Sequence, residues 1–184
     1  MSKIKLNLRK SREVIFTFCE GETELLFFYF LKTEYWKNKN SKLNFKKAKD
    51  IKGFSDFKGF EKKYLSLIKG VRLTKNEFKT VKFLFVIDND LKDSIDIESF
   101  LKGRGHLVQL CSPNTEGMIL NIVGKPQTQV VGDKDFRAKC KSSFYEHFGH
   151  KAHKWLLNES KVRMLFKEEV FKKTLPVMYD LFTK

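Results

Sequence analysis

Three stretches of the chain are almost continuously apolar or β-branched, and they cover residues 13–19, 81–87 and 106–111. Runs of this kind are typical of central strands in a parallel sheet, because helices cover both faces of such strands. A fourth, weaker run within residues 43–49 also predicts a strand. The pattern therefore indicates a sheet whose central strands are buried.

Helical patterns separate these strands. Residues 56–69, for example, carry their aromatic and aliphatic side chains on one helical face. Further helices are expected over residues 22–37, 94–102 and 113–123. Strands and helices thus alternate along the chain, which favours an α/β fold with a mainly parallel sheet flanked by helical crossovers.

The pattern changes after Gly124. Residues 126–135 are typical of a loop, or of a brief strand around Val130 and Val131. The remainder, from residue 137 to residue 184, is predicted to be helical with breaks near Gly149, Asn158 and Pro176.

The size of the chain favours one compact domain. Its 184 residues and 41% hydrophobic content suffice to bury one full core but are marginal for two. We therefore predict an α/β core over residues 1–124. A loop and helical extension over residues 125–184 is expected to pack on the same core.

Charge indicates the class of partner. The formal net charge is +15, and an excess of this size attracts polyanions, of which nucleic acid is the leading candidate. Basic and aromatic residues alternate between residues 36 and 57, as in surfaces that follow phosphates and stack bases. A solvated lysine face over core aromatics would give the same pattern. The candidate nucleic-acid-binding residues are Lys42, Lys46, Lys47, Lys49 and Lys52.

Two further features bear on location. The sequence has no uncharged apolar stretch of about 20 residues that could cross a bilayer, and its basic N-terminus lacks the apolar core of a secretory signal. We therefore expect a cytoplasmic protein with no membrane partner. Cys19, Cys111 and Cys140 form no Cys-x-x-Cys pair, so we expect small buried residues in a reducing compartment.

Acidic side chains follow the predicted strands. Glu20 comes directly after the first strand, Asp88 and Asp90 follow the strand over residues 81–87, and Glu116 follows the last. Because ligand sites of open parallel sheets form at the carboxyl ends of the strands, we expect these acids to meet at one edge. Glu24 lies one helical turn beyond Glu20 and could join them.

A cluster of carboxylates at a sheet edge favours a divalent cation. Asp88 and Asp90 are two residues apart, so their side chains point the same way if strand geometry persists. Like charges this close repel each other unless a cation or a proton compensates, and carboxylate oxygens suit Mg²⁺ or Mn²⁺. Helix capping is the alternative role for any single acid, above all for Glu22 and Glu24.

Three sequence motifs contain these acids, namely Cys-Glu-Gly-Glu-Thr-Glu over residues 19–24, Asp-Asn-Asp over residues 88–90, and Ser-Pro-Asn-Thr-Glu-Gly-Met over residues 112–118. The first two, a glutamate after the first strand and an Asp-x-Asp after a later one, resemble the pattern of the Toprim family. The first and third motifs are similar to those of small stand-alone Toprim proteins of bacterial defence loci, the RloB-like group. The resemblance extends over about residues 13–124.

The resemblance implies roles for the acids. Glu20 would be the general acid/base, Asp88 and Asp90 the metal ligands, and Glu24 or Glu116 would complete the site. Bound Mg²⁺ or Mn²⁺ would neutralise a scissile phosphate, and a nearby lysine would stabilise charge in the transition state. The lysine candidates are Lys139, Lys141 and Lys125.

The implied function is that of a Mg²⁺-dependent nuclease acting on RNA, with tRNA as one candidate, or on DNA, as an antiphage defence effector. The alternative is a Toprim module that binds nucleic acid or a partner without catalysis. An ATPase partner is expected by family analogy, since the chain has no Gly-x-x-x-x-Gly-Lys-Ser/Thr loop. Assembly as a homo-oligomer is also considered.

Overall fold

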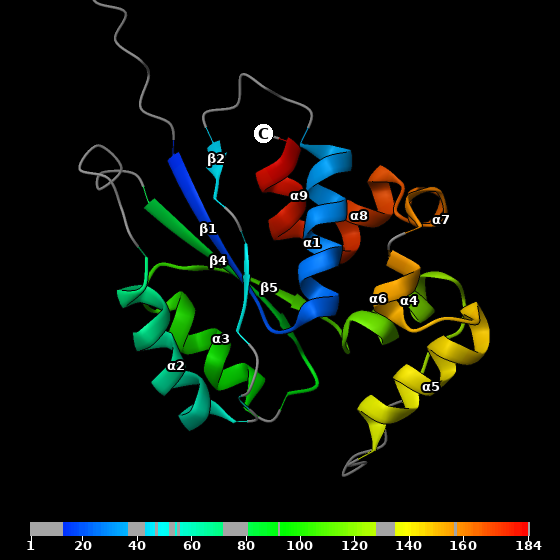
Figure 1. The fold of residues 1–184 in the computed structure, drawn as a ribbon, viewed down its shortest axis with the longest axis horizontal. Coiled ribbons are helices and arrows are strands. Elements are labelled where there is room, and N and C mark those ends of the chain that lie inside the picture. Colours follow the sequence, from blue (N-terminus) through cyan, green and yellow to red (C-terminus); the bar gives the residue numbers. More distant parts are fainter. Residues whose placement is uncertain are drawn as a thin grey trace, which may run out of the picture.

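A parallel β-sheet forms the centre of the molecule in the computed structural model (Figure 1). The structure describes residues 13–36, 43–46, 48–51, 54, 56–71, 81–91, 93–127, 135–156 and 158–183. The described strands are β1 (Glu13–Cys19), β2 (Leu43–Phe45), β3 (Lys49–Asp50), β4 (Val81–Asp88) and β5 (Leu107–Cys111). Their order is β2-β1-β4-β5, and β3 pairs with the later part of β1.

All of these strand pairs are parallel, so the predicted α/β class with a mainly parallel sheet is confirmed. The predicted strand within residues 43–49 is divided between β2 and β3, which both pair with β1 at the edge of the sheet. The predicted brief strand around Val130 and Val131 lies outside the described residues.

Helices cover both faces of the sheet. The helices before the change of pattern are α1 (Glu22–Tyr35), α2 (Phe57–Lys69), α3 (Ser94–Lys102) and α4 (Thr115–Ile122). The later ones are α5 (Phe136–Phe148), α6 (Ala152–Leu156), α7 (Glu159–Leu165), α8 (Glu168–Thr174) and α9 (Pro176–Thr183). Figure 1 shows α2 and α3 on one face of the sheet and α1 and α9 on the other.

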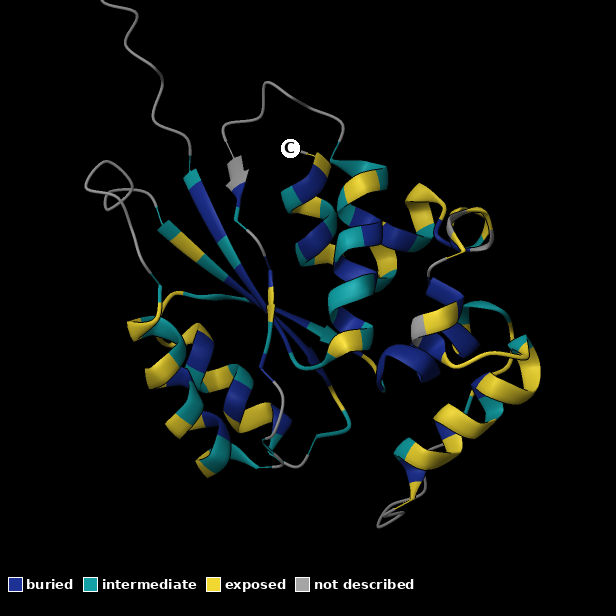
Figure 2. Cartoon of the chain, viewed as in Figure 1, coloured by how far each residue is buried: buried dark blue, intermediate teal, exposed yellow. Residues whose placement is uncertain are grey.

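Alternation along the strands divides the core into two clusters. Ile15 of β1 and Val86 of β4 point to the face covered by α1 and the C-terminal helices. Phe18 and Phe85 point to the opposite face, where Phe60 of α2 packs against them. The central strands are therefore buried on both sides, as their apolar runs predict (Figure 2).

The C-terminal helices pack on the α1 side of the sheet. Phe27 of α1 contacts Phe166, with ring centroids 4.9 Å apart, and Trp155 of α6 is buried against Phe144 of α5. Breaks occur near Gly149, Asn158 and Pro176 as predicted, and one between α7 and α8 was not predicted.

Two other expectations concern the described part of the chain. Cys19, Cys111 and Cys140 are free and buried, as expected. None of the helices among the described residues combines the length and apolar character that a membrane span requires.

Candidate active site

Strand register brings two acidic segments together at one edge of the sheet. Cys19 at the end of β1 lies opposite Val86 of β4. The next residue, Glu20, therefore lies beside the carboxyl end of β4. The main-chain N–H of Glu20 donates to the Val86 carbonyl at 2.9 Å. In return, the main-chain N–H of Asp88 donates to Glu20 Oε2 at 2.9 Å. Two residues 68 positions apart are thereby fixed to each other.

Asp88 is held from the opposite side by the start of α4. Its Oδ1 atom accepts hydrogen bonds from the main-chain N–H of Thr115 at 3.0 Å and from the Thr115 hydroxyl at 3.1 Å. Asp88 is only 5% exposed. The carboxylate is therefore positioned by fixed donors rather than by solvent.

Asp90 is positioned by Asn114, which lies just before α4. One end of the Asn114 amide caps this helix by accepting from the Gly117 N–H at 2.7 Å. The other end donates to Asp90 Oδ2 at 2.6 Å. The cap of α4 is thus Asn114, while Asp88 and Asp90 remain directed at the site.

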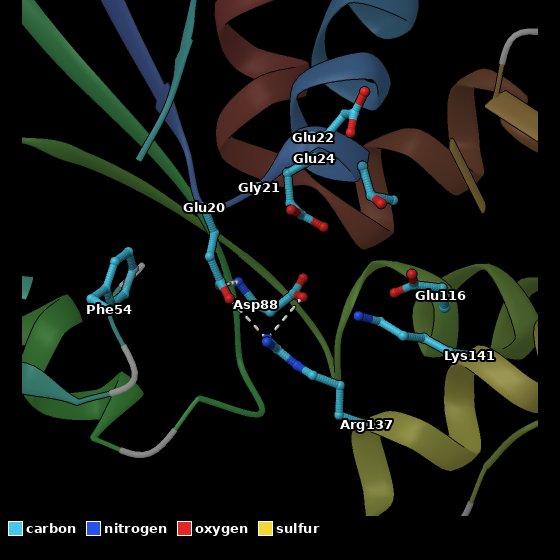
Figure 3. Close-up of a pocket in the computed structure, with 10 residues that line it drawn as sticks. Glu20, Gly21, Glu22, Glu24, Phe54, Asp88, Glu116, Arg137 and Lys141 are labelled. Atoms are coloured by element: carbon cyan, nitrogen blue, oxygen red, sulfur yellow. Dashed lines mark hydrogen bonds and ion pairs between the residues drawn. The ribbon is translucent and has the colours of Figure 1, made fainter. Parts of the chain in front are cut away.

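A cation that the sequence analysis did not identify joins the acids. Arg137, the second residue of α5, donates from Nη2 to Glu20 at 2.9 Å, to Asp88 at 3.2 Å and to Asp90 at 2.8 Å. Its Nε atom also lies 3.2 Å from both carboxylate oxygens of Asp90. One guanidinium therefore binds three of the five predicted acids, as Figure 3 shows for Glu20 and Asp88.

Two further acids face the same pocket. Glu24 in the first turn of α1 and Glu116 in the first turn of α4 are each 5% exposed. The pocket has a volume of about 270 Å³. It is lined by Glu20, Gly21, Glu22, Thr23, Glu24, Phe54, Asp88, Glu116, Arg137 and Lys141. The structure thus brings together the acids of all three sequence motifs.

The pKa values of four acids at the site are raised. Burial raises the pKa of Asp88 well above its usual range, and the charges of Glu24 and Glu20 raise it further. Burial is also the main cause of the raised pKa values of Glu20, Glu24 and Glu116. Arg137 opposes these shifts, but the net direction remains upward for each of these four acids. Burial therefore disfavours the ionised forms of these acids, and Arg137 offsets this effect in part.

Of the three lysines considered for catalysis, Lys141 is the one that lines this pocket in the described structure. Its charge lowers the pKa of Glu116. Lys139 and Lys125 are exposed and are not among the described lining residues. Arg137, not one of these lysines, contacts the acids. Its side-chain chemistry is the feature of the sequence that could have marked it as a candidate. It is the one arginine in residues 125–160, and guanidinium binds carboxylates in a fork that ammonium cannot form.

The predicted nucleic-acid-binding lysines are only partly described. Lys49 is exposed and lies in β3 opposite Phe18 of β1. Phe18 precedes Glu20 by two residues. Lys46 donates its main-chain N–H to Ile15 at the same edge of the sheet. Lys42, Lys47 and Lys52 lie outside the described residues.

A second cavity adjoins the acidic pocket. Its volume is about 400 Å³, and it shares Thr23, Glu116 and Lys141 with the first pocket. Lys151 and Tyr145 also line it, and Tyr145 is 55% exposed. Basic and aromatic groups thus lie directly beside the cluster of acids.

The carboxylates are oxygen donors suited to Mg²⁺ or Mn²⁺, and Glu20, Glu24, Asp88, Asp90 and Glu116 could hold such an ion. In the described part of the chain, no group of three or more His, Cys, Asp and Glu side chains already stands in a metal-binding arrangement. Three of the acids instead contact Arg137.

Comparison with known proteins yields no relative: no family model, no curated protein and no solved structure matches the chain.

Proposed function

We propose that the chain is a Mg²⁺- or Mn²⁺-dependent nuclease that hydrolyses phosphodiester bonds at the cluster of Glu20, Asp88 and Asp90. The observation that carries this proposal is the convergence of buried carboxylates from two strand ends on one point. Their positions are fixed by donors from α4 and α5. Buried charges of one sign are costly, so such an arrangement is typical of a functional site.

The donor set fits a hard divalent cation. Five predicted acids lie at the site with two positive side chains, Arg137 and Lys141, so negative groups outnumber positive ones. Burial is the main cause of the raised pKa values of Asp88, Glu20, Glu24 and Glu116, and a bound cation would offset that cost by stabilising the ionised carboxylates. A bound ion would neutralise the scissile phosphate and lower the pKa of attacking water.

The protein's own groups supply the proton transfers. In hydrolysis water adds to phosphorus, one phosphorus–oxygen ester bond breaks, and the leaving oxygen takes up a proton. Glu20 is suited to accept a proton and return it, because burial raises its pKa towards neutrality. Arg137 and Lys141 line the pocket and would stabilise charge on the phosphoryl oxygens.

Nucleic acid is the substrate that the charge favours. The chain carries a net charge of +15, and Lys49 lies near the acidic edge of the sheet. Lys141, Lys151 and Tyr145 in the adjoining cavity offer phosphate contacts and a ring on which a base can stack. The substrate class proposed is RNA, including tRNA, or DNA.

The family assignment belongs to the same proposal. The motif order resembles Toprim proteins of the RloB-like group, and the parallel sheet with acids at its carboxyl edge supports this reading. An antiphage role in the cytoplasm with an ATPase partner would follow from that assignment.

One observation favours a second function. Arg137 already neutralises part of the charge on Glu20, Asp88 and Asp90, as an arginine would in a module that keeps the fold and binds nucleic acid without cleaving it. Only the nuclease would cleave nucleic acid, so a cleavage assay distinguishes the two functions.

The test is incubation of purified protein with tRNA, other RNA, single-stranded DNA and duplex DNA in Mg²⁺, in Mn²⁺ and in chelator. The nuclease proposal predicts cleavage that needs the cation and that Asp88→Ala abolishes. Asp96→Ala, an exposed acid of α3, serves as the control and should retain activity. Cleavage that persists in Asp88→Ala would exclude the proposed site. Binding of nucleic acid without cleavage under all conditions would favour the second function.

A further inference from the structure

Arg137 lies in the space enclosed by the three acids. Its Nη2 atom is within 3.2 Å of a carboxylate oxygen of Glu20, Asp88 and Asp90, and its Nε atom bonds Asp90 as well. These are the oxygens that would have to turn towards a divalent cation. A guanidinium and a metal ion would compete for this position, since both are cations and both would occupy the space between the same three carboxylates.

The backbone of Arg137 is fixed while its side chain can move. Phe136 and Cys140 of the same helix are buried, and α5 packs against α4 through Cys140 Sγ near Gly117. The side chain of Arg137 is 38% exposed and lines the open acidic pocket. The guanidinium can therefore leave the acids by side-chain rotation without unfolding α5.

The contacts hold Arg137 only as long as the acids lack another cation. Arg137 supplies one positive charge to three carboxylates, at distances of 2.9 Å to Glu20, 3.2 Å to Asp88 and 2.8 Å to Asp90. Glu24 and Glu116 are also buried and line the same pocket, so further carboxylates surround this single positive group. A doubly charged ion satisfies the cluster better and would displace the guanidinium.

We propose that Arg137 is a built-in competitor for the divalent cation: it keeps the acidic cluster assembled in the metal-free protein and withdraws from Glu20, Asp88 and Asp90 when the ion binds. This inference rests on the proposed metal-dependent function. It assigns Arg137 a role in setting metal affinity, separate from any contact with substrate.

Calorimetric titration of the metal-free protein with Mn²⁺ tests this role directly, without substrate. Arg137→Gln removes the competitor and is expected to bind Mn²⁺ at least about tenfold more tightly than the wild type, a difference of about 1.4 kcal/mol. Lys141→Gln removes the same charge from the same pocket and controls for through-space attraction, with an expected change below about threefold. Arg163→Gln, an exposed arginine paired with Glu34, controls for net charge and should bind as the wild type does.

Thermal unfolding provides the second readout. In chelator, Arg137→Gln should melt below the wild type because the acids repel one another without a counter-ion. In saturating Mn²⁺ that difference should shrink or reverse, since ligand binding stabilises the tighter binder more. A purely structural arginine would lower the melting temperature equally in both buffers. Arg137→Lys keeps the charge, and it should give an intermediate affinity if Arg137→Gln does not fold.

The outcomes are distinct. If the wild type binds Mn²⁺ and Arg137→Gln binds it with unchanged or weaker affinity, the competitor role is overturned. The proposed nuclease site is then still intact. Absence of Mn²⁺ binding in the wild type and in both Arg137 variants overturns this role and the metal-dependent function together.

Discussion

Asp88 shows how a single residue is constrained by the site. Its Oδ1 atom is bound by Thr115, its Oδ2 atom by Arg137, and its main-chain N–H by Glu20. Burial nevertheless raises its pKa first, and the charges of Glu24 and Glu20 add to the effect. Fixed donors thus hold the side chain in place although burial disfavours its charge.

The Thr115 hydroxyl should contribute measurably to this position. Thr115→Val keeps the shape and the main-chain donor to Asp88 but removes the hydroxyl bond of 3.1 Å. Thr115 is fully buried, so we expect the free energy of unfolding to fall by about 1 kcal/mol in urea titrations. Thr33→Val in α1 removes an exposed hydroxyl and should change it by less than about 0.5 kcal/mol. Equal losses in both variants would argue against a specific role for Thr115.

The pH dependence of stability can measure the cost of burying the Glu24 carboxylate. Its pKa is raised by burial and then by Glu116, so the folded state favours the protonated form. This contribution to stability is present below the unfolded pKa of about 4.3 and is lost as pH rises through the folded pKa. In chelator, Glu24→Gln should therefore be more stable than the wild type at pH 8, by on the order of 1 kcal/mol, and the difference should vanish near pH 4.

Urea titrations across this pH range give the measurement. Glu61→Gln, an exposed residue of α2, should change the free energy of unfolding by less than about 0.5 kcal/mol at every pH. A Glu24→Gln variant that is less stable than the wild type at pH 8 would show that the buried charge is compensated.

At the level of elements, several residues of the segment from Ser112 to Met118 have identifiable roles in the structure. Asn114 caps α4 and binds Asp90, Thr115 binds Asp88, and Glu116 enters the pocket. Gly117 permits the close approach of α5. The motif is thus a helix start in which Asn114, Thr115 and Glu116 contact the acids or line the pocket.

Gly117→Ala should separate α4 from α5. The added Cβ atom would lie 2.7 Å from Pro113 Cγ and 3.1 Å from Cys140 Sγ, and both neighbours are packed. We expect the variant to lose about 1–3 kcal/mol of stability and to cleave more slowly, because α5 carries Arg137 and Lys141. Asn121→Ala on the exposed side of α4 is the matched control. Wild-type stability of Gly117→Ala in urea would contradict the close packing described.

The elements were largely predictable, and the reasons are physical. Buried central strands give continuous apolar runs, so β1, β4 and β5 follow the sequence closely. The edge strands β2 and β3 are short and partly polar, and the split between them left no pattern. The acids could be placed because strand ends share an edge. Arg137 could not, since its position depends on how α5 packs, 47 residues beyond Asp90.

For the whole molecule, charge and shape act together. The chain carries a net charge of +15, yet its pocket is lined by acids, so positive charge outside the site can attract a polyanion while the site itself attracts a cation. Lys141 and Lys151 border the cavity next to the acids. On the proposed function, these two lysines would guide a phosphate backbone to the site.

Salt dependence tests this division. Affinity for nucleic acid in chelator should fall linearly with salt on a logarithmic scale, by about 0.9 for each phosphate neutralised on duplex DNA. Lys141→Ala and Lys151→Ala should each reduce that slope by about 1 in fluorescence anisotropy titrations. Lys62→Ala, an exposed lysine of α2, should leave the slope unchanged. A uniform reduction by all three variants would indicate a diffuse rather than a local attraction.

The central claim is that the acids at the carboxyl edge of the sheet bind a divalent cation. It is tested most directly by the anomalous difference map of crystals grown in saturating Mn²⁺. We predict a peak bound by Asp88 and Asp90, with the Arg137 guanidinium moved away from both. A map without a peak at these acids would contradict the account.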